Sequence, residues 1–121
     1  MNEAELLDNI IATLNKNGWN SSLVYSYQEE YVILSDNKKW IVDIVLFNCG
    51  EPIGVIEVKQ GCINSKNALV QAKDYAAALN VNLILITNGE EIYQAFRDSE
   101  TSKKIEQFPT TDNVSKLFKL L

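Results

Sequence analysis

Three charged side chains interrupt two strongly apolar stretches near the middle of the chain, and they are the residues best suited to chemistry. Asp43 lies inside the stretch WIVDIVLF, and Glu57 and Lys59 close the stretch IGVIEVK. Carboxylates are rarely fully buried without a partner, because removing an unpaired charge from water is costly. We therefore expect the three side chains to meet in one site.

The spacing of Asp43 and Glu57 places them opposite each other in a predicted β-hairpin. Ile and Val dominate the runs Ile41–Phe47 and Ile53–Val58, as in central strands buried on both faces, and a turn segment with Gly and Pro separates them. If the hairpin is symmetric about Gly50, the carboxylates form a cross-strand pair with side-chain roots roughly 5 Å apart. Such a pair repels unless a cation lies between its members, and Mg²⁺ is commonly held by one or two carboxylates and substrate phosphate oxygens.

Lys59 lies two residues beyond Glu57 and therefore on the same face of the strand. Beside a metal ion, a lysine can hold a phosphate, orient a water molecule or stabilise a developing negative charge. The alternative is a structural ion pair between Lys59 and one of the carboxylates. The spacing by itself leaves both interpretations open.

The elements that must position these residues begin with a helix over residues 2–17, where apolar side chains recur at helical spacing and Gly18 ends the helix. At ~100° per residue, Glu3 falls near the centre of the apolar stripe, so it points toward the core or a cleft. The alternative is an acidic residue favoured by the helix dipole in the first turn.

The segment before the hairpin contains two short strand candidates, residues 22–27 and 31–34, followed by a polar turn over residues 35–39. Its aromatic side chains are assigned to packing rather than to base stacking, because no basic residue lies between Lys16 and Lys38.

After the hairpin and a polar loop, the pattern predicts a helix over residues 65–79, in which Gln71 and Tyr75 share a face. A helix between the Glu57 strand and the next strand implies a right-handed crossover, so these strands run parallel and the sheet is mixed. The remaining expected elements are strands over 81–87 and 91–96, a surface segment over 97–111 with a helical turn near 103–107, and a short amphipathic helix over 112–121.

The composition indicates one soluble globular domain spanning residues 1–121. No apolar run approaches the ~18 residues needed to cross a membrane, and the acidic N-terminus is unlike a signal peptide. Two cysteines without a metal-binding pattern favour reduced thiols and a cytoplasmic location. The absence of His excludes Ser–His and Cys–His catalysis and imidazole zinc sites.

The net charge of −5, with a single arginine, argues against a chain that grips duplex DNA by itself. Any DNA contact is then small and local, or a motor or partner chain holds the DNA.

Asp43 followed by Glu57-Val58-Lys59 resembles the PD-(D/E)xK nuclease signature, and roughly residues 2–96 are similar to the N-terminal nuclease domain of type I restriction enzyme R subunits. The resemblance implies a restriction-endonuclease-like core, which is an α/β fold of the α+β type with a central mixed β-sheet flanked by helices on both sides. It also implies Mg²⁺ as the cofactor, with Mn²⁺ as a substitute, and DNA as the substrate.

The resemblance further implies a role for each matching residue. Asp43 and Glu57 correspond to metal ligands, Glu3 to a residue that assists metal binding, and Lys59 to the catalytic lysine. Together with the metal, Lys59 would activate a water molecule that attacks a phosphodiester in line. Val42 stands where a Pro often precedes the Asp, which is a tolerated departure.

Two further motifs fit the same family. Gln71 and Tyr75 resemble the Q-x-x-x-Y motif shared with RecB-type nucleases, which supports the site and contacts DNA. Thr87-Asn88-Gly89 resembles the T-N-G that follows the next strand in these domains.

Two classes of function follow. The first is a Mg²⁺-dependent DNA endonuclease domain, and the second is a catalytically inactive nuclease-fold module that acts as a DNA-binding or assembly element in a defence or phage system. The chain has no phosphate-binding Gly-rich loop, so we expect that it cannot translocate DNA with ATP and that it is either an excised domain or a small stand-alone relative. The partners that the resemblance implies are a helicase motor or other restriction or defence subunits. One site cuts one strand, so double-strand cleavage would require a dimer or two successive nicks.

Overall fold

A central β-sheet organises the computed structural model of the chain, which describes residues 2–19, 24–63 and 65–114. The sheet has six strands in the order β1-β2-β3-β4-β5-β6, and all neighbouring pairs are antiparallel except β3 and β4, which are parallel. The strands are β1 (Tyr25–Ser35), β2 (Lys38–Asn48), β3 (Glu51–Val58), β4 (Leu83–Thr87), β5 (Ile92–Phe96) and β6 (Lys103–Ile105). The predicted mixed sheet is therefore confirmed.

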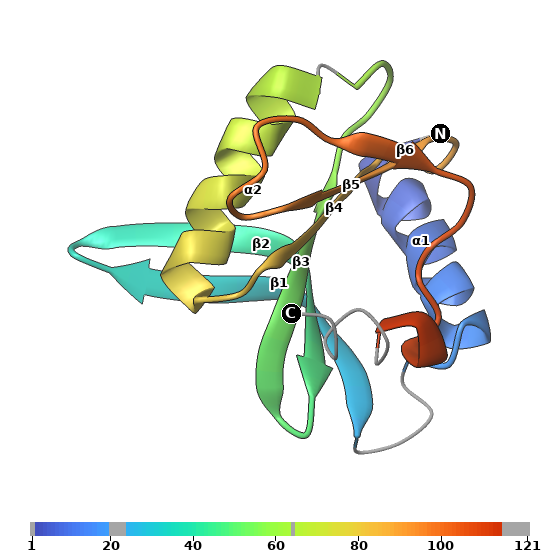
Figure 1. The fold of residues 1–121 in the computed structure, drawn as a ribbon, viewed down its shortest axis with the longest axis horizontal. Coiled ribbons are helices and arrows are strands. Elements are labelled where there is room, and N and C mark those ends of the chain that lie inside the picture. The colour runs from blue at the N-terminus through green and yellow to red at the C-terminus, as the bar shows by residue number, and fades with distance from the viewer. Residues whose placement is uncertain (1, 20–23, 64, 115–121) are drawn as a thin grey trace.

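Two helices cover opposite faces of the sheet, α1 (Glu3–Lys16) on one side and α2 (Ser65–Leu79) on the other (Figure 1). Each helix packs its own apolar cluster against the strands. Leu6, Ile10 and Leu14 of α1 belong to the first cluster. Ala68, Leu69, Ala72 and Ala76 of α2 belong to the second. The predicted flanking of the sheet on both sides is confirmed.

The helix boundaries agree closely with the sequence pattern. The side chain of Asn2 caps α1 by accepting a hydrogen bond from the backbone N–H of Glu5 at 2.8 Å, and Asn17 followed by Gly18 ends the helix. The expected bounds of α2 are those observed. Neither helix in the described part of the chain combines the length and apolar character that crossing a membrane requires.

The β2–β3 hairpin has the predicted register near the charged residues, although its turn is tighter than expected. Ile44 pairs with Ile56 and Leu46 with Gly54, as symmetry about Gly50 requires. Nearer the turn the register shifts, and the strands reach a two-residue turn at Cys49 and Gly50, both with positive φ. A bulge in β3 thus restores the register that a longer symmetric turn would have given.

Outside this hairpin, three expected elements differ from the structure or are described only in part. The two strand candidates over 22–27 and 31–34 are parts of one strand, β1, whose long pairing with β2 overrides the polar interruption between them; residues 20–23 lie outside the described residues. The helical turn expected near 103–107 is wrong, because residues 103–105 form β6. Ile105 of β6 pairs with Ile92 of β5 and packs against the α1 cluster. Residues 111–114 are helical, and the rest of the helix expected over 112–121 lies outside the described residues.

Two glycines in neighbouring loops provide a matched test of how tightly α1 is packed on the sheet. Both have positive φ, but a Cβ on Gly89 would lie 2.5 Å from Cδ1 of the buried Leu6, whereas a Cβ on Gly61 would meet nothing within 4 Å. We expect Gly61→Ala to cost about 1 kcal/mol for the backbone alone. Gly89→Ala should cost about 1–3 kcal/mol more, because Leu6 must also move. Urea denaturation of the two variants measures the difference, and equal costs would contradict close packing at Leu6.

Candidate active site

The candidate site lies where β2 and β3 separate. Their ladder of paired residues ends at Ile44 and Ile56, one residue short of Asp43 and Glu57. Beyond this point the Asp43 side chain replaces the backbone of β2, since its Oδ2 accepts a hydrogen bond from the N–H of Val58 at 2.7 Å. This charge-assisted bond fixes the carboxylate of the half-buried Asp43 at the end of β3.

Glu57 is an unusual buried acid. The residue is 6% exposed, and its Oε2 atom is buried without any hydrogen-bond partner. Burial, and then the neighbouring negative charge of Asp43, raise the pKa of Glu57 from 4.5 to about 8, and the positive charge of Lys59 opposes them. The structure therefore brings the two carboxylates together, and in the protein alone Glu57 holds a proton at neutral pH.

Lys59 links the carboxylates to α2. Its Nζ lies 3.6 Å from Oε1 of Glu57 and donates a hydrogen bond to Oε1 of Gln71 at 2.8 Å. Gln71 in turn donates through Nε2 to the hydroxyl of Tyr75 at 2.9 Å. The i, i+4 spacing of Gln71 and Tyr75 thus makes a short polar chain that fixes the position of the lysine.

Tyr75 anchors this chain in the apolar layer beneath α2. The residue is 9% exposed, and its ring centroid lies 5.8 Å from that of Trp40. Burial raises the pKa of Tyr75, and the charges of Glu57 and Asp43 add to the increase, while the hydrogen bond from Gln71 opposes it. Tyr75 is therefore a neutral hydroxyl group held within the electrostatic reach of both carboxylates.

Glu3 lies in α1, on the other face of the sheet from Gln71 and Tyr75 of α2. It is exposed, and with Asp43 it lines a pocket of about 330 Å³ on the α1 side. Glu30 lines the same pocket and was not singled out from the sequence. The signal that could have identified it is the polar interruption between the two strand candidates, where Glu30 lies.

The candidate metal ligands are the carboxylates of the site. Within residues 2–19, 24–63 and 65–114, no group of three or more His, Cys, Asp or Glu side chains could hold a metal ion. Glu3 lines the pocket with Asp43, and its help in metal binding stays a prediction, which leaves Asp43 and Glu57 as the pair of candidate ligands. The pair that remains offers only oxygen donors and includes a buried oxygen without a partner, which fits Mg²⁺ because this ion commonly takes one or two carboxylates.

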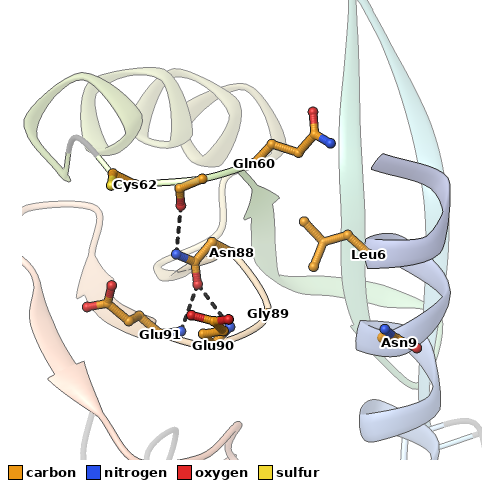
Figure 2. Close-up of a pocket in the computed structure, with 9 residues that line it drawn as sticks. Leu6, Asn9, Gln60, Cys62, Asn88, Gly89, Glu90 and Glu91 are labelled. Carbon is orange, nitrogen blue, oxygen red and sulfur yellow. Dashed lines mark hydrogen bonds between the residues drawn. The ribbon is translucent and has the colours of Figure 1, made fainter. Parts of the chain in front are cut away.

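A larger pocket of about 500 Å³ lies beside the candidate site (Figure 2). The pocket is lined by Leu6 and Asn9 of α1, by residues 60–62 after β3 and by residues 88–91 after β4. Asp43, Glu57 and Lys59 are not part of its lining. Asn88 connects its walls by donating to the carbonyl of Gly61 at 2.7 Å and accepting from the N–H groups of Glu90 and Glu91. Three internal hydrogen bonds give Asn88 of the T-N-G motif a structural function.

Comparisons with a family model and with solved structures both find a match. The family model described as type I restriction enzyme R protein N terminus (HSDR_N) matches residues 14–110, a range that contains Asp43 to Tyr75 but not Glu3. A solved fragment of a protein assigned as an HsdR subunit of a type I restriction enzyme from Vibrio vulnificus YJ016 is similar, with a TM-score of 0.75 and 26% identity. The match covers 98% of this chain and 25% of that one. No curated protein matches the chain.

The raised pKa of Glu57 predicts how stability depends on pH without metal. Because the folded state retains the proton up to about pH 8 and the unfolded state loses it near 4.5, the free energy of unfolding should fall as pH rises between these values. We expect a loss on the order of a few kcal/mol, absent from Glu57→Gln. Urea denaturation across this range measures it, and parallel curves for the two proteins would contradict the assignment.

Proposed function

Because the chain belongs to the family of type I restriction enzyme R protein N termini, we propose that it is a metal-dependent DNA endonuclease domain that hydrolyses phosphodiester bonds. The fold supports the proposal, since the mixed sheet flanked by two helices is that of restriction-endonuclease-like proteins, and 98% of this chain matches part of the HsdR fragment. The proposed cofactor is Mg²⁺, with Mn²⁺ as a substitute.

The observation that carries the proposal is the pair of carboxylates where β2 and β3 separate. Glu57 has a buried oxygen without a partner, and the negative charge of Asp43 lies beside it. Two like charges this close are unfavourable unless a proton or a cation compensates them. A divalent cation would satisfy both carboxylates at once, and Asp43 and Glu57 are the residues that would hold it.

When bound, Mg²⁺ would supply Lewis-acid activation of a phosphodiester and of water. The chain's own residues would position the reacting groups. Gln71 and Tyr75 hold the ammonium group of Lys59 beside Glu57, so this fixed positive charge is available to a phosphate oxygen as negative charge develops. The side chain of Lys59 is 35% exposed, which leaves it accessible to a substrate.

DNA must be held largely by something other than this chain. The net charge is −5, whereas duplex binding depends on phosphate neutralisation. The chain spans about a quarter of the HsdR fragment that it matches. We propose that a helicase motor or other restriction subunits, in the same protein or in a complex, supply the grip on DNA and present it to this site.

A nicking assay on supercoiled plasmid with Mg²⁺ or Mn²⁺ tests the proposal. Lys59→Ala should lower the rate by about 10²-fold or more, because one charge-stabilising group aimed at the reacting centre is lost. Lys104→Ala is a matched control, since Lys104 forms a comparable ion pair with Glu91 at 3.5 Å on the surface. Equal activity of Lys59→Ala and the wild type would contradict the proposed role.

Metal titration separates the enzyme from the alternative of an inactive module. Because binding must displace the proton of Glu57, the apparent affinity for Mn²⁺ should rise about tenfold per pH unit up to the pKa of about 8 and then level off. Asp43→Ala should abolish binding. Calorimetry or the Mn²⁺ electron paramagnetic resonance signal measures it, and a wild-type protein that binds no metal at millimolar concentration would favour the inactive module.

A further inference from the structure

We propose that Glu30 is a positioning residue whose left-handed backbone conformation turns the β1–β2 hairpin over at Asp43 and thereby sets the direction of the Asp43 carboxylate. The inference deepens the proposed function, on which the importance of Asp43 rests. The effect of Glu30 on Asp43 is a property of the backbone and requires neither metal nor DNA.

The conformation of Glu30 is the first observation. Its φ is +50°, a value that side chains with a Cβ rarely adopt. The other described non-glycine residues with positive φ lie in turns or after a helix: Asp36, Asn37, Cys49 and Asn80. Glu30 therefore stands out because it adopts this conformation inside a strand, where strain that the surrounding structure maintains often serves a function.

The second observation is a break in pairing at this residue. Glu29 pairs with Ile44 and Tyr31 with Val42, so Glu30 and its counterpart Asp43 are both left out of the ladder without a change of register. Neither strand contains an extra residue there. The break is therefore a local rotation of both strands rather than an ordinary bulge.

The side chains on the two sides of the break show what this rotation does. Residues two apart on a regular strand face the same way. On β2, Ile44 packs against the α1 cluster, whereas Val42, two positions away, packs against the α2 cluster. On β1, Tyr27 and Tyr31, four positions apart, differ in the same way. The hairpin thus exchanges faces at Glu30 and Asp43.

The rotation explains why Asp43 can serve the site. Outside the ladder, its carboxylate is free to turn toward β3 and accept the hydrogen bond from the N–H of Val58 at 2.7 Å. In a regular strand, Asp43 would point to one face of the sheet and could not replace the backbone at its edge. The left-handed residue opposite Asp43 is therefore what orients this carboxylate.

The proposal assigns the effect to the backbone of Glu30, and its substitutions separate backbone from charge. Glu30→Gly removes the carboxylate but accepts positive φ without strain, whereas Glu30→Val disfavours it strongly. Glu30→Gln keeps the shape and removes the charge. Asp36→Val is a matched control, because Asp36 has a φ of +45° in the β1–β2 turn, away from Asp43.

The measurement is amide hydrogen exchange of Val58 by NMR in the metal-free protein, with Leu85 in the buried centre of β4 reporting on global unfolding. We expect the amide of Val58 to exchange about tenfold faster relative to that of Leu85 in Glu30→Val, since the hydrogen bond that Val58 donates to Asp43 is lost. Glu30→Gly, Glu30→Gln and Asp36→Val should leave this ratio unchanged. If Glu30→Val does not fold, Glu30→Thr supplies the same β-branched preference with a polar side chain.

Equal acceleration in Glu30→Gly and Glu30→Val would overturn the proposal, because the side chain rather than the backbone would then be responsible. Acceleration in Asp36→Val would overturn it as well, since any strain in the hairpin would have the same effect. Mn²⁺ titration of these variants should show weakened binding in Glu30→Val alone. A wild-type protein that binds no Mn²⁺, with the expected exchange pattern, would contradict the proposed function and support the positioning.

Discussion

The repulsion between Asp43 and Glu57 is the constraint on which the rest of the site depends. Bringing two carboxylates together at the end of a buried strand is unfavourable, and the protein alone compensates by retaining a proton on Glu57 and by placing Lys59 3.6 Å away. The hydrogen bond that the N–H of Val58 donates holds the side chain of Asp43 in place. The two neighbouring acids thus have different surroundings, since Glu57 is buried beside Lys59 and Asp43 is hydrogen-bonded to the backbone of β3.

Elements far apart in the sequence share the work of maintaining this arrangement. The parallel pairing of β3 and β4 requires the crossover through α2, and the crossover brings Gln71 and Tyr75 over Lys59. On the other side of the sheet, α1 covers the same strands. The site therefore rests on helices and strands, and Glu30, whose φ is positive inside a strand, lies where the hairpin changes faces.

The parts of this site that could be predicted from sequence are those governed by local periodicity. The two-residue repeat of a strand places Glu57 and Lys59 on one face, and the i, i+4 spacing in a helix pairs Gln71 with Tyr75. The meeting of Asp43 and Glu57 required a register, and it was predicted through a symmetric turn that the protein replaces by a tighter turn and a bulge. Glu30 could not be predicted in the same way, because tertiary packing on two different clusters, and no local propensity, imposes its conformation.

The acidic character of the chain bears on how such a site would be controlled. A nuclease that binds duplex DNA poorly by itself cuts only where another component delivers the DNA, since local concentration then replaces intrinsic affinity. The proton on Glu57 has a related effect, because it lowers the negative charge of a site that holds neither metal nor substrate. On the proposed function, a net charge of −5 is therefore no obstacle to nuclease activity. On the same proposal, cleavage depends on the partner that supplies the DNA.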